Sequence, residues 1–479
     1  MDKNWKIGSL PARVALAAGM LLAPTFGQAQ GPDFGAQTER LLRLRASQLF
    51  GVFRPVPASS TLSLDAAAAE ANPQKLVTLA LGLKATVVTA DANAAPNIDM
   101  MVLWPDDQAP SHIIACNEEG PTDPGVQRIS LFDGSVQTLL SGMESCDPIR
   151  RTPWGTVIVG EEVGGTGHLL EIIDPLQVNN VLFNRATHQA EDSPNGTGAE
   201  NVADRPAVGR LAFEGIGLYP NGVMYYGDEN RPLNGTPGGA YFKFIPTSPW
   251  TGGDAIVSLD ESPLAQGTVA GLRLGKRSGN TDYGEGTNTG LGIWVPVPNA
   301  SGADLRAAAA ALKLTGYYRP EDLEIDLAAL EEENVRFCGN NTGNEAQDHT
   351  WGEAICITDG TLEQSVANTA TPEVQFLVIG TPELAMMDNM AYRPGRGTWI
   401  LMEDGDGSVF GRNNDMWACL DDRADADQLS DGCIRIATLN DFNAEWTGGF
   451  FDASGKHFFV SVQHNVTGHG IVLEITGWR

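Results

Sequence analysis

Basic residues, cysteine and histidine are scarce in this sequence, and each scarcity narrows what the protein can do. Lysine and arginine total 31 among 479 residues, against 60 aspartates and glutamates, and the formal net charge is −29. So acidic a chain repels nucleic acid phosphates and anionic lipid, so we expect neither as a partner. The same excess of carboxylates favours solubility and the binding of divalent cations.

Only six cysteines are present, and they form no CxxC motif and no Cys/His cluster of the kind that binds zinc. His168, His457 and His469 lack each other at ligand spacing, which favours surface or packing roles. Pairing of sequence neighbours would place each disulfide within one repeat unit; free buried thiols are the alternative. The expected pairs are Cys116–Cys146, Cys338–Cys356 and Cys419–Cys433.

No apolar run reaches the roughly 20 residues that a membrane-spanning helix needs. The longest candidate, Val14 to Pro24, follows Lys3, Lys6 and Arg13 and precedes a small-residue cleavage site at 27–29. This order of regions predicts a secretory signal peptide over residues 1–29, and therefore a periplasmic or secreted protein without an integral membrane segment.

Long amphipathic helices are scarce, whereas the 55 glycines and 28 prolines suit a turn-dense β fold. Residues 30–97 read as an N-terminal lead-in, with helical spacing in Glu39 to Phe50, a small helix or linker at Ala66 to Ala71, and a strand over Lys75 to Thr89. Apolar strands and glycine-containing turns then alternate over residues 98–479.

About six such units start near residues 98, 146, 210, 316, 385 and 445, with long insertions at 183–209, 247–310 and 404–432. Radial repetition of small antiparallel sheets predicts an all-β fold, a six-bladed β-propeller, over 98–479. A pair of β-sandwiches is the competing architecture.

Acidic, amide or histidine side chains follow an apolar strand in five of these units. They are Asn117-Glu118-Glu119, Glu161-Glu162, Asp228-Glu229-Asn230, Glu403-Asp404 and Gln463-His464. Equivalent strand ends of a propeller converge on one end of its central channel. Crowded carboxylates raise one another's pKa unless cations bind between them, and calcium tolerates irregular sets of oxygen ligands.

A second set of polar residues opens the units and contains a single cation, Arg319. Its acids and amides include Glu214, Glu321-Asp322, Asp388-Asn389 and Glu445. An arginine among carboxylates can form a structural ion pair or a bidentate clamp on a phosphate oxygen, and local spacing alone favours the ion pair.

Several segments resemble the PhoX-type bacterial alkaline phosphatases. Thr152-Pro153-Trp154-Gly155-Thr156 leading to Glu161-Glu162 is similar to the family's TPWGT…CEE signature. Further similarities follow in the family's order, at residues 209–215, 225–229, 239–244, 319–322, 388–392, 445–448 and 462–464. Together they cover most of residues 110–475.

The resemblance implies an exported six-bladed propeller that hydrolyses small phosphate monoesters at a site with iron and calcium. Carried over residue by residue, it implies catalytic roles for Arg319, which binds phosphate, and Glu321. The metal ligands it implies, together with the strand-end pattern, are Glu118, Glu161, Glu162, Glu214, Asp228, Glu229, Glu321 and Asp388.

One position departs from the family, because Gly160 stands where its iron-binding cysteine precedes the paired glutamates. Glycine supplies no ligand and a thiolate is what favours iron, so the sequence supports calcium more than iron. The leading hypothesis is a metal-dependent phosphoesterase. The alternatives are a non-catalytic calcium-binding propeller, as a binding or surface-matrix protein, and another hydrolase such as a lactonase.

Overall fold

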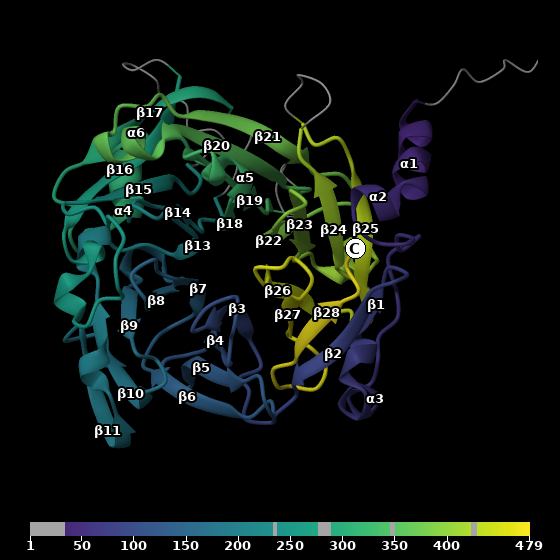
Figure 1. Ribbon diagram of the computed structural model, residues 1–479, viewed down its shortest axis with the longest axis horizontal. Coiled ribbons are helices and arrows are strands. Elements are labelled where there is room, and N and C mark those ends of the chain that lie inside the picture. Colours follow the sequence, from purple (N-terminus) through teal and green to yellow (C-terminus); the bar gives the residue numbers. More distant parts are fainter. Residues whose placement is uncertain (1–33, 233–236, 276–288, 345–349, 423–428) are drawn as a thin grey trace, which may run out of the picture.

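The computed structural model describes residues 34–479, apart from 233–236, 276–288, 345–349 and 423–428. The expected signal peptide over 1–29 lies outside the described residues. Five antiparallel-rich sheets stand around a central axis in a propeller-like arrangement (Figure 1). The all-β prediction is therefore confirmed, and the sandwich alternative is wrong because the sheets are arranged radially.

The first two sheets come from residues 98–204. One has the strand order β11-β10-β6-β5-β4-β3 and the other β12-β9-β8-β7. Their strands are β3 (Ile98–Trp104), β4 (His112–Asn117), β5 (Pro124–Ser130), β6 (Val136–Ser141), β7 (Cys146–Arg151), β8 (Thr156–Glu161), β9 (Leu169–Ile173), β10 (Asn179–Asn184), β11 (Gln189–Thr197) and β12 (Val202–Asp204).

A nine-stranded sheet follows, in the order β13-β14-β15-β16-β17-β21-β20-β19-β18. Its strands are β13 (Phe213–Leu218), β14 (Met224–Asp228), β15 (Tyr241–Pro246), β16 (Gly267–Leu274), β17 (Gly290–Val297), β18 (Pro320–Ile325), β19 (Asn334–Asn341), β20 (Glu353–Thr361) and β21 (Glu373–Ile379). Within the described part of the chain, Gly290↔Val374 and Leu291↔Glu373 join β17 to β21, so the two halves of this sheet meet through a short ladder.

The last two sheets combine the two ends of the described chain, in the orders β1-β25-β24-β23-β22 and β2-β28-β27-β26. Their strands are β1 (Val77–Leu79), β2 (Lys84–Thr89), β22 (Met387–Arg393), β23 (Thr398–Glu403), β24 (Asp415–Leu420), β25 (Cys433–Leu439), β26 (Glu445–Phe451), β27 (Phe458–Gln463) and β28 (Val472–Thr476). The single strand expected over Lys75 to Thr89 is therefore wrong: the chain turns at Gly82, which has a φ of +108°, and its two parts enter different sheets.

The helices are short. They are α1 (Phe34–Leu44), α2 (Ala46–Leu49), α3 (Ala66–Ala71), α4 (Leu305–Leu312), α5 (Leu327–Glu331), α6 (Leu362–Ala367) and α7 (Gly407–Phe410). Among the described helices, none is long and apolar enough to cross a membrane.

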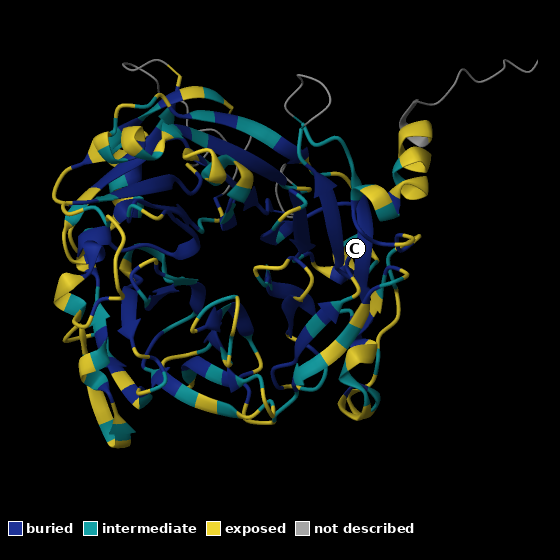
Figure 2. Cartoon of the chain, in the orientation of Figure 1, coloured by how far each residue is buried: buried dark blue, intermediate teal, exposed yellow. Residues whose placement is uncertain are grey.

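Six strands surround the axis: β3, β7, β13, β18, β22 and β26. Each packs against the next, and β26 packs against β3, which closes the circuit. The six starts expected from the sequence fall at or just before these strands. Apolar side chains fill the spaces between neighbouring sheets, so the inner strands are buried, and exposed residues lie mainly on the outer strands, loops and helices (Figure 2).

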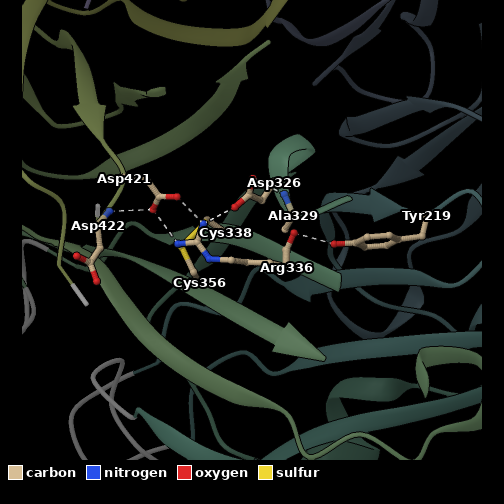
Figure 3. The surroundings of a disulfide bond; sticks show 8 residues. All are labelled: Tyr219, Asp326, Ala329, Arg336, Cys338, Cys356, Asp421 and Asp422. Atoms are coloured by element: carbon tan, nitrogen blue, oxygen red, sulfur yellow. Dashed lines mark hydrogen bonds and ion pairs between the residues drawn. A yellow bond between two sulfur atoms is a disulfide. The ribbon is translucent and has the colours of Figure 1, made fainter. Parts of the chain in front are cut away.

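All six cysteines pair as neighbours in sequence, so the alternative of free thiols is wrong. The Cys338–Cys356 disulfide joins β19 to β20, beside Arg336, which pairs with Asp326 and Asp421 (Figure 3). The expectation that each disulfide lies within one unit fails for Cys116–Cys146, because Cys116 belongs to β4 and Cys146 opens β7 in the next sheet.

Candidate metal centre

The inner strands carry a β-bulge near their start. In five of them the same register recurs: one residue pairs with the end of the second strand, and the next residue lies in the bulge. The bulge residues are all acidic: Asp99, Asp147, Glu214, Glu321 and Asp388. A bulge re-aims the side chain it contains, and this repetition directs five carboxylates to one end of the central axis.

The second strand of each sheet supplies a further set, one residue beyond its last paired position. These residues are Glu118, Glu162, Glu229, Asp404 and His464. They sit opposite the bulges, so two rings of side chains face the same space. In β19 the equivalent position is Thr342, a residue whose hydroxyl donates to the Met387 carbonyl.

Together these side chains line a cavity of about 270 Å³ at the axis. Its lining is Asp99, Glu118, Asp147, Glu162, Glu214, Glu229, Arg231, Arg319, Glu321, Asp388, Asp404, Glu445, Thr447, Gln463 and His464. Ten of the fifteen are carboxylates, against two arginines, so the cavity is strongly electronegative.

Burial shifts the protonation of this cluster. It raises the pKa of Asp147, Glu162 and Glu214 well above the usual range, and neighbouring carboxylates raise it further. Burial, followed by the charge of Asp404, raises the pKa of Asp388 to about 7. A bound cation would reverse these shifts, because it offsets both the desolvation and the mutual repulsion of the carboxylates.

The cavity also contains buried oxygens with no hydrogen-bond partner among the described residues, on Asp99, Asp147 and Glu214. Carboxylate oxygens of Asp147, Glu162 and Glu214 lie within 4.8 Å of one another. A buried carboxylate oxygen without a partner is costly, and hard cations such as calcium bind sets of this kind. The residues present therefore fit an oxygen-ligated divalent cation.

Arg319 is the buried cation of the cavity. Its Nε donates to Glu229 Oε1 at 2.9 Å, and its Nη2 lies 2.8 Å from Glu321 Oε1 and 3.6 Å from Asp404 Oδ2. Burial alone would lower the pKa of Arg319, but Glu321 and Glu229 raise it well above the ordinary value. Its φ of +55° is uncommon for a residue other than glycine, and such backbone conformations concentrate at functional sites.

Most of the expected ligands come together here: Glu118, Glu162, Glu214, Glu229, Glu321 and Asp388 line the cavity. Glu161 and Asp228 point elsewhere. Glu161 accepts hydrogen bonds from the Glu144 and His168 backbones and lies 2.7 Å from His168 Nδ1. Asp228 pairs with Arg306 at 2.7 Å. Successive residues of a strand face opposite ways, so only one member of each acidic pair reaches the cavity.

Asp99 and Asp147 were missed as site residues. A signal for them exists, since both directly follow the apolar or cysteine residue that opens a unit, as Glu214 and Asp388 do. Asp404 and Glu445 were singled out in the sequence as polar ends of strands but not as ligands; both line the cavity.

Gly160 lies directly opposite the bulge that contains Asp147 and Pro148. A Cβ atom at Gly160 would stand 2.7 Å from Pro148 Cγ and 2.8 Å from Phe213 Cβ. Both contacts are too short for real atoms, so this backbone is packed around glycine. The position therefore has no room for a thiolate ligand without a shift of β7 or β13.

The fold and the cavity define a β-propeller-like protein with a carboxylate-lined centre. The family model for the alkaline phosphatase PhoX matches residues 149–465, about two thirds of the chain. The chain therefore belongs to the PhoX alkaline phosphatase family. No match was found among curated protein sequences.

A solved structure from the PhoX family supports the fold. The structure of Pseudomonas fluorescens PhoX in complex with vanadate, a transition state analogue, is similar with a TM-score of 0.58 at 15% identity, covering 87% of this chain and 98% of that chain. A putative gluconolactonase matches with a TM-score of 0.41 at 12% identity, covering 83% and 93% of the two chains. A streptogramin B lyase matches with a TM-score of 0.37 at 9% identity, covering 82% and 97%. These last two values are too low to carry an argument.

Proposed function

We propose that this protein is an exported, metal-dependent phosphoesterase that hydrolyses small phosphate monoesters in its central cavity. The observation that carries the proposal is a buried arginine, Arg319, held by Glu229 and Glu321 at the edge of a cluster of carboxylates. Membership of the PhoX family supports the reaction class, and the vanadate complex of Pseudomonas fluorescens PhoX supports a phosphoryl site on this fold.

In this proposal the propeller has six blades, with the nine-stranded sheet counted as two. Its halves β13–β17 and β18–β21 are joined by the short β17–β21 ladder and enclose an apolar cluster of their own, as neighbouring sheets do elsewhere in the ring. Six inner strands and their recurrent bulges support the same count.

The residues that line the cavity have different roles in this proposal. Asp147, Glu162 and Glu214 hold a divalent cation, joined by Glu118, Glu229, Glu321 and Asp388 around the cavity. When bound, such cations polarise phosphoryl oxygens and position the nucleophile. Arg319 binds the phosphate and stabilises the negative charge that develops in the transition state. Glu321 fixes the guanidinium by its 2.8 Å ion pair, so the clamp is oriented before substrate enters.

Calcium is the cation that this donor set fits best, because every candidate ligand is an oxygen. Gly160 removes the thiolate, and its packing against Pro148 and Phe213 leaves that position closed. Export is supported by the three disulfides, which persist in oxidising compartments, and places the protein in the periplasm or outside the cell.

The test is hydrolysis of p-nitrophenyl phosphate by the purified protein, with and without chelator, beside elemental analysis. We expect chelator-sensitive activity, and a loss of about 100-fold or more in kcat/KM for Arg319→Ala. Arg435→Ala is the matched control, because Arg435 is equally buried and ion-paired, to Asp415 at 2.6 Å, but does not line the cavity. Full activity in a folded Arg319→Ala variant would show that Arg319 does not bind the phosphate.

The second candidate is a non-catalytic calcium-binding propeller, and Gly160 is the observation that favours it. It predicts bound calcium, no iron, and no turnover of any phosphate ester by the folded wild-type protein. The same assay and elemental analysis separate the two candidates, since chelator-sensitive turnover excludes this one.

A further inference from the structure

A second group of metal-ligand side chains lies away from the central cavity, between the first two sheets. His168 directly precedes β9, His188 lies in the turn between β10 and β11, and Asp204 ends β12. One potential ligand atom of each lies within 4.8 Å of the others. None of the three belongs to the lining of the central cavity.

Glu161 orients the imidazole ring of His168. Its Oε2 atom lies 2.7 Å from His168 Nδ1 and also accepts from the His168 backbone N–H at 3.0 Å. A carboxylate on one imidazole nitrogen holds the ring so that the other nitrogen points away from that carboxylate. This carboxylate–histidine pairing is the arrangement that orients histidine ligands in metal sites.

The Nε2 atom of His168 faces the second histidine. His188 Nδ1 is 2.8 Å from it and 3.8 Å from Asp204 Oδ2. Zinc–nitrogen bonds of about 2.0–2.1 Å in a tetrahedral site separate ligand atoms by about 3.3 Å, which lies between these two distances. Both distances are close to that separation, and His188, which is half exposed, can move to adjust them.

Asp204, the third candidate ligand, is held in place by an arginine. Arg210 donates to both carboxylate oxygens of Asp204, and both residues are nearly buried. His168 is also nearly buried, so two of the three ligands are fixed while the third opens to solvent. The half-exposed His188 gives an ion a path of entry and leaves a coordination position for water.

We propose that His168, His188 and Asp204 bind a divalent transition metal of the zinc class. Two imidazole nitrogens and one carboxylate favour zinc over calcium, whereas the carboxylate-rich central cavity favours calcium. The ion connects the β10–β11 hairpin, which is paired to β6 of the first sheet, with β9 and β12 of the second. Its role is to clamp these two sheets together on the outside of the propeller.

Sequence spacing did not reveal this group, because its members are separated by 20 and 16 positions. His168 was assigned a surface or packing role. Only the return of the chain through the β10–β11 insertion brings His188 and Asp204 beside it.

The test is titration of the full-length, metal-stripped protein with Zn²⁺ and with Co²⁺ as a spectroscopic probe. We expect wild-type protein to bind one equivalent of Co²⁺ with the intense visible bands of a tetrahedral nitrogen–oxygen site, displaced by Zn²⁺. His188→Asn should lose those bands and bind one fewer zinc, or bind it at least tenfold more weakly. Asparagine tolerates the left-handed backbone of His188, with its φ of +59°, so the turn is kept.

His457→Asn is the matched control, because His457 is similarly exposed and also lies beside a carboxylate, Glu474. It should leave zinc binding unchanged. Zinc should also raise the melting temperature of wild-type protein and of His457→Asn, but not of His188→Asn. Equal zinc stoichiometry and affinity in His188→Asn and wild type, or the absence of tetrahedral bands in wild type, would overturn the proposal.

Discussion

Glu353, in β20, is a carboxyl group buried away from the central cavity. Its Oε1 atom accepts a hydrogen bond from Asn341 Nδ2 at 3.2 Å. Burial raises the pKa of Glu353 from 4.5 to about 8, against the smaller lowering effect of that hydrogen bond. The folded protein therefore keeps this proton at pH values where the unfolded chain releases it.

This difference makes stability depend on pH. The contribution is fully present below pH 4.5 and is lost as pH rises toward about 8, because the unfolded state ionises first. Glu353→Gln keeps the acceptor but cannot ionise. We expect its free energy of unfolding, relative to wild type, to rise between pH 5 and 8 by an amount on the order of a few kcal/mol, since one pKa unit corresponds to about 1.36 kcal/mol.

Urea unfolding of both proteins at pH 5, 6.5 and 8 measures this change. Glu331→Gln, at an exposed position, is the control and should track wild type throughout. A difference between Glu353→Gln and wild type that stays constant with pH would mean that Glu353 is ionised in the folded protein.

At single residues, the sequence predicted that carboxylates gather at the central channel more accurately than it predicted which carboxylates do so. The paired acids at strand ends pointed to the central channel, but Glu161 and Asp228 face away from it because alternate residues of a strand point in opposite directions. Asp99 and Asp147 depend on β-bulges, whose positions were not evident from hydrophobic patterning. The packing of Pro148 and Phe213 around Gly160 likewise required the fold.

The Cys116–Cys146 disulfide is an element-scale feature, since it fastens β4 to β7 across two sheets. Cys419–Cys433 instead joins directly paired residues of β24 and β25. From chain entropy, loops of 30 and 14 residues correspond to about 3.6 and about 3.0 kcal/mol of stability.

Replacing each pair by serine should lower the free energy of unfolding by roughly these amounts. Only the Cys116→Ser/Cys146→Ser variant should also weaken calcium binding, because Cys146 directly precedes Asp147 in the bulge of β7. Denaturant unfolding and calcium titration of both double variants measure the two effects. Equal calcium affinity in both variants would show that the Asp147 bulge keeps its geometry without the disulfide.

Strands were predictable from the sequence where neighbouring residues determine them. The starts of the units coincide with inner strands because short apolar runs bounded by turns are a local signal. The β10–β11 hairpin was read as an insertion between units, yet it adds to the first sheet through β6. Such pairing depends on the edge of a strand from an earlier part of the chain, so the residues of the hairpin do not predict it.

At the scale of the whole molecule, the ring is closed by its two ends. β2 pairs antiparallel with β28, with Lys84 opposite Thr476 and Val87 opposite Leu473, and β1 pairs with β25. Residues 30–97 were expected to be a lead-in outside the propeller; their strands complete two of its sheets. This contact joins residues far apart in the sequence, so forming it carries a high cost in loop-closure entropy.

A chain that begins at Asp91 lacks both closing strands and exposes the edges of β25 and β28. Leu76, Val77 and Leu83 are buried against the core, and each such side chain contributes about 1.5–3 kcal/mol. We expect this truncated chain to melt at a clearly lower temperature and to aggregate through its open strand edges.

A chain beginning at Arg45 lacks α1 but keeps both strands, and should melt close to the full-length protein. Scanning calorimetry and light scattering compare the two. Adding a peptide of residues 75–90 should recover part of the lost stability, because it can pair with the same edges. Equal melting temperatures for the two truncations would show that the ring is held by its inner strands alone.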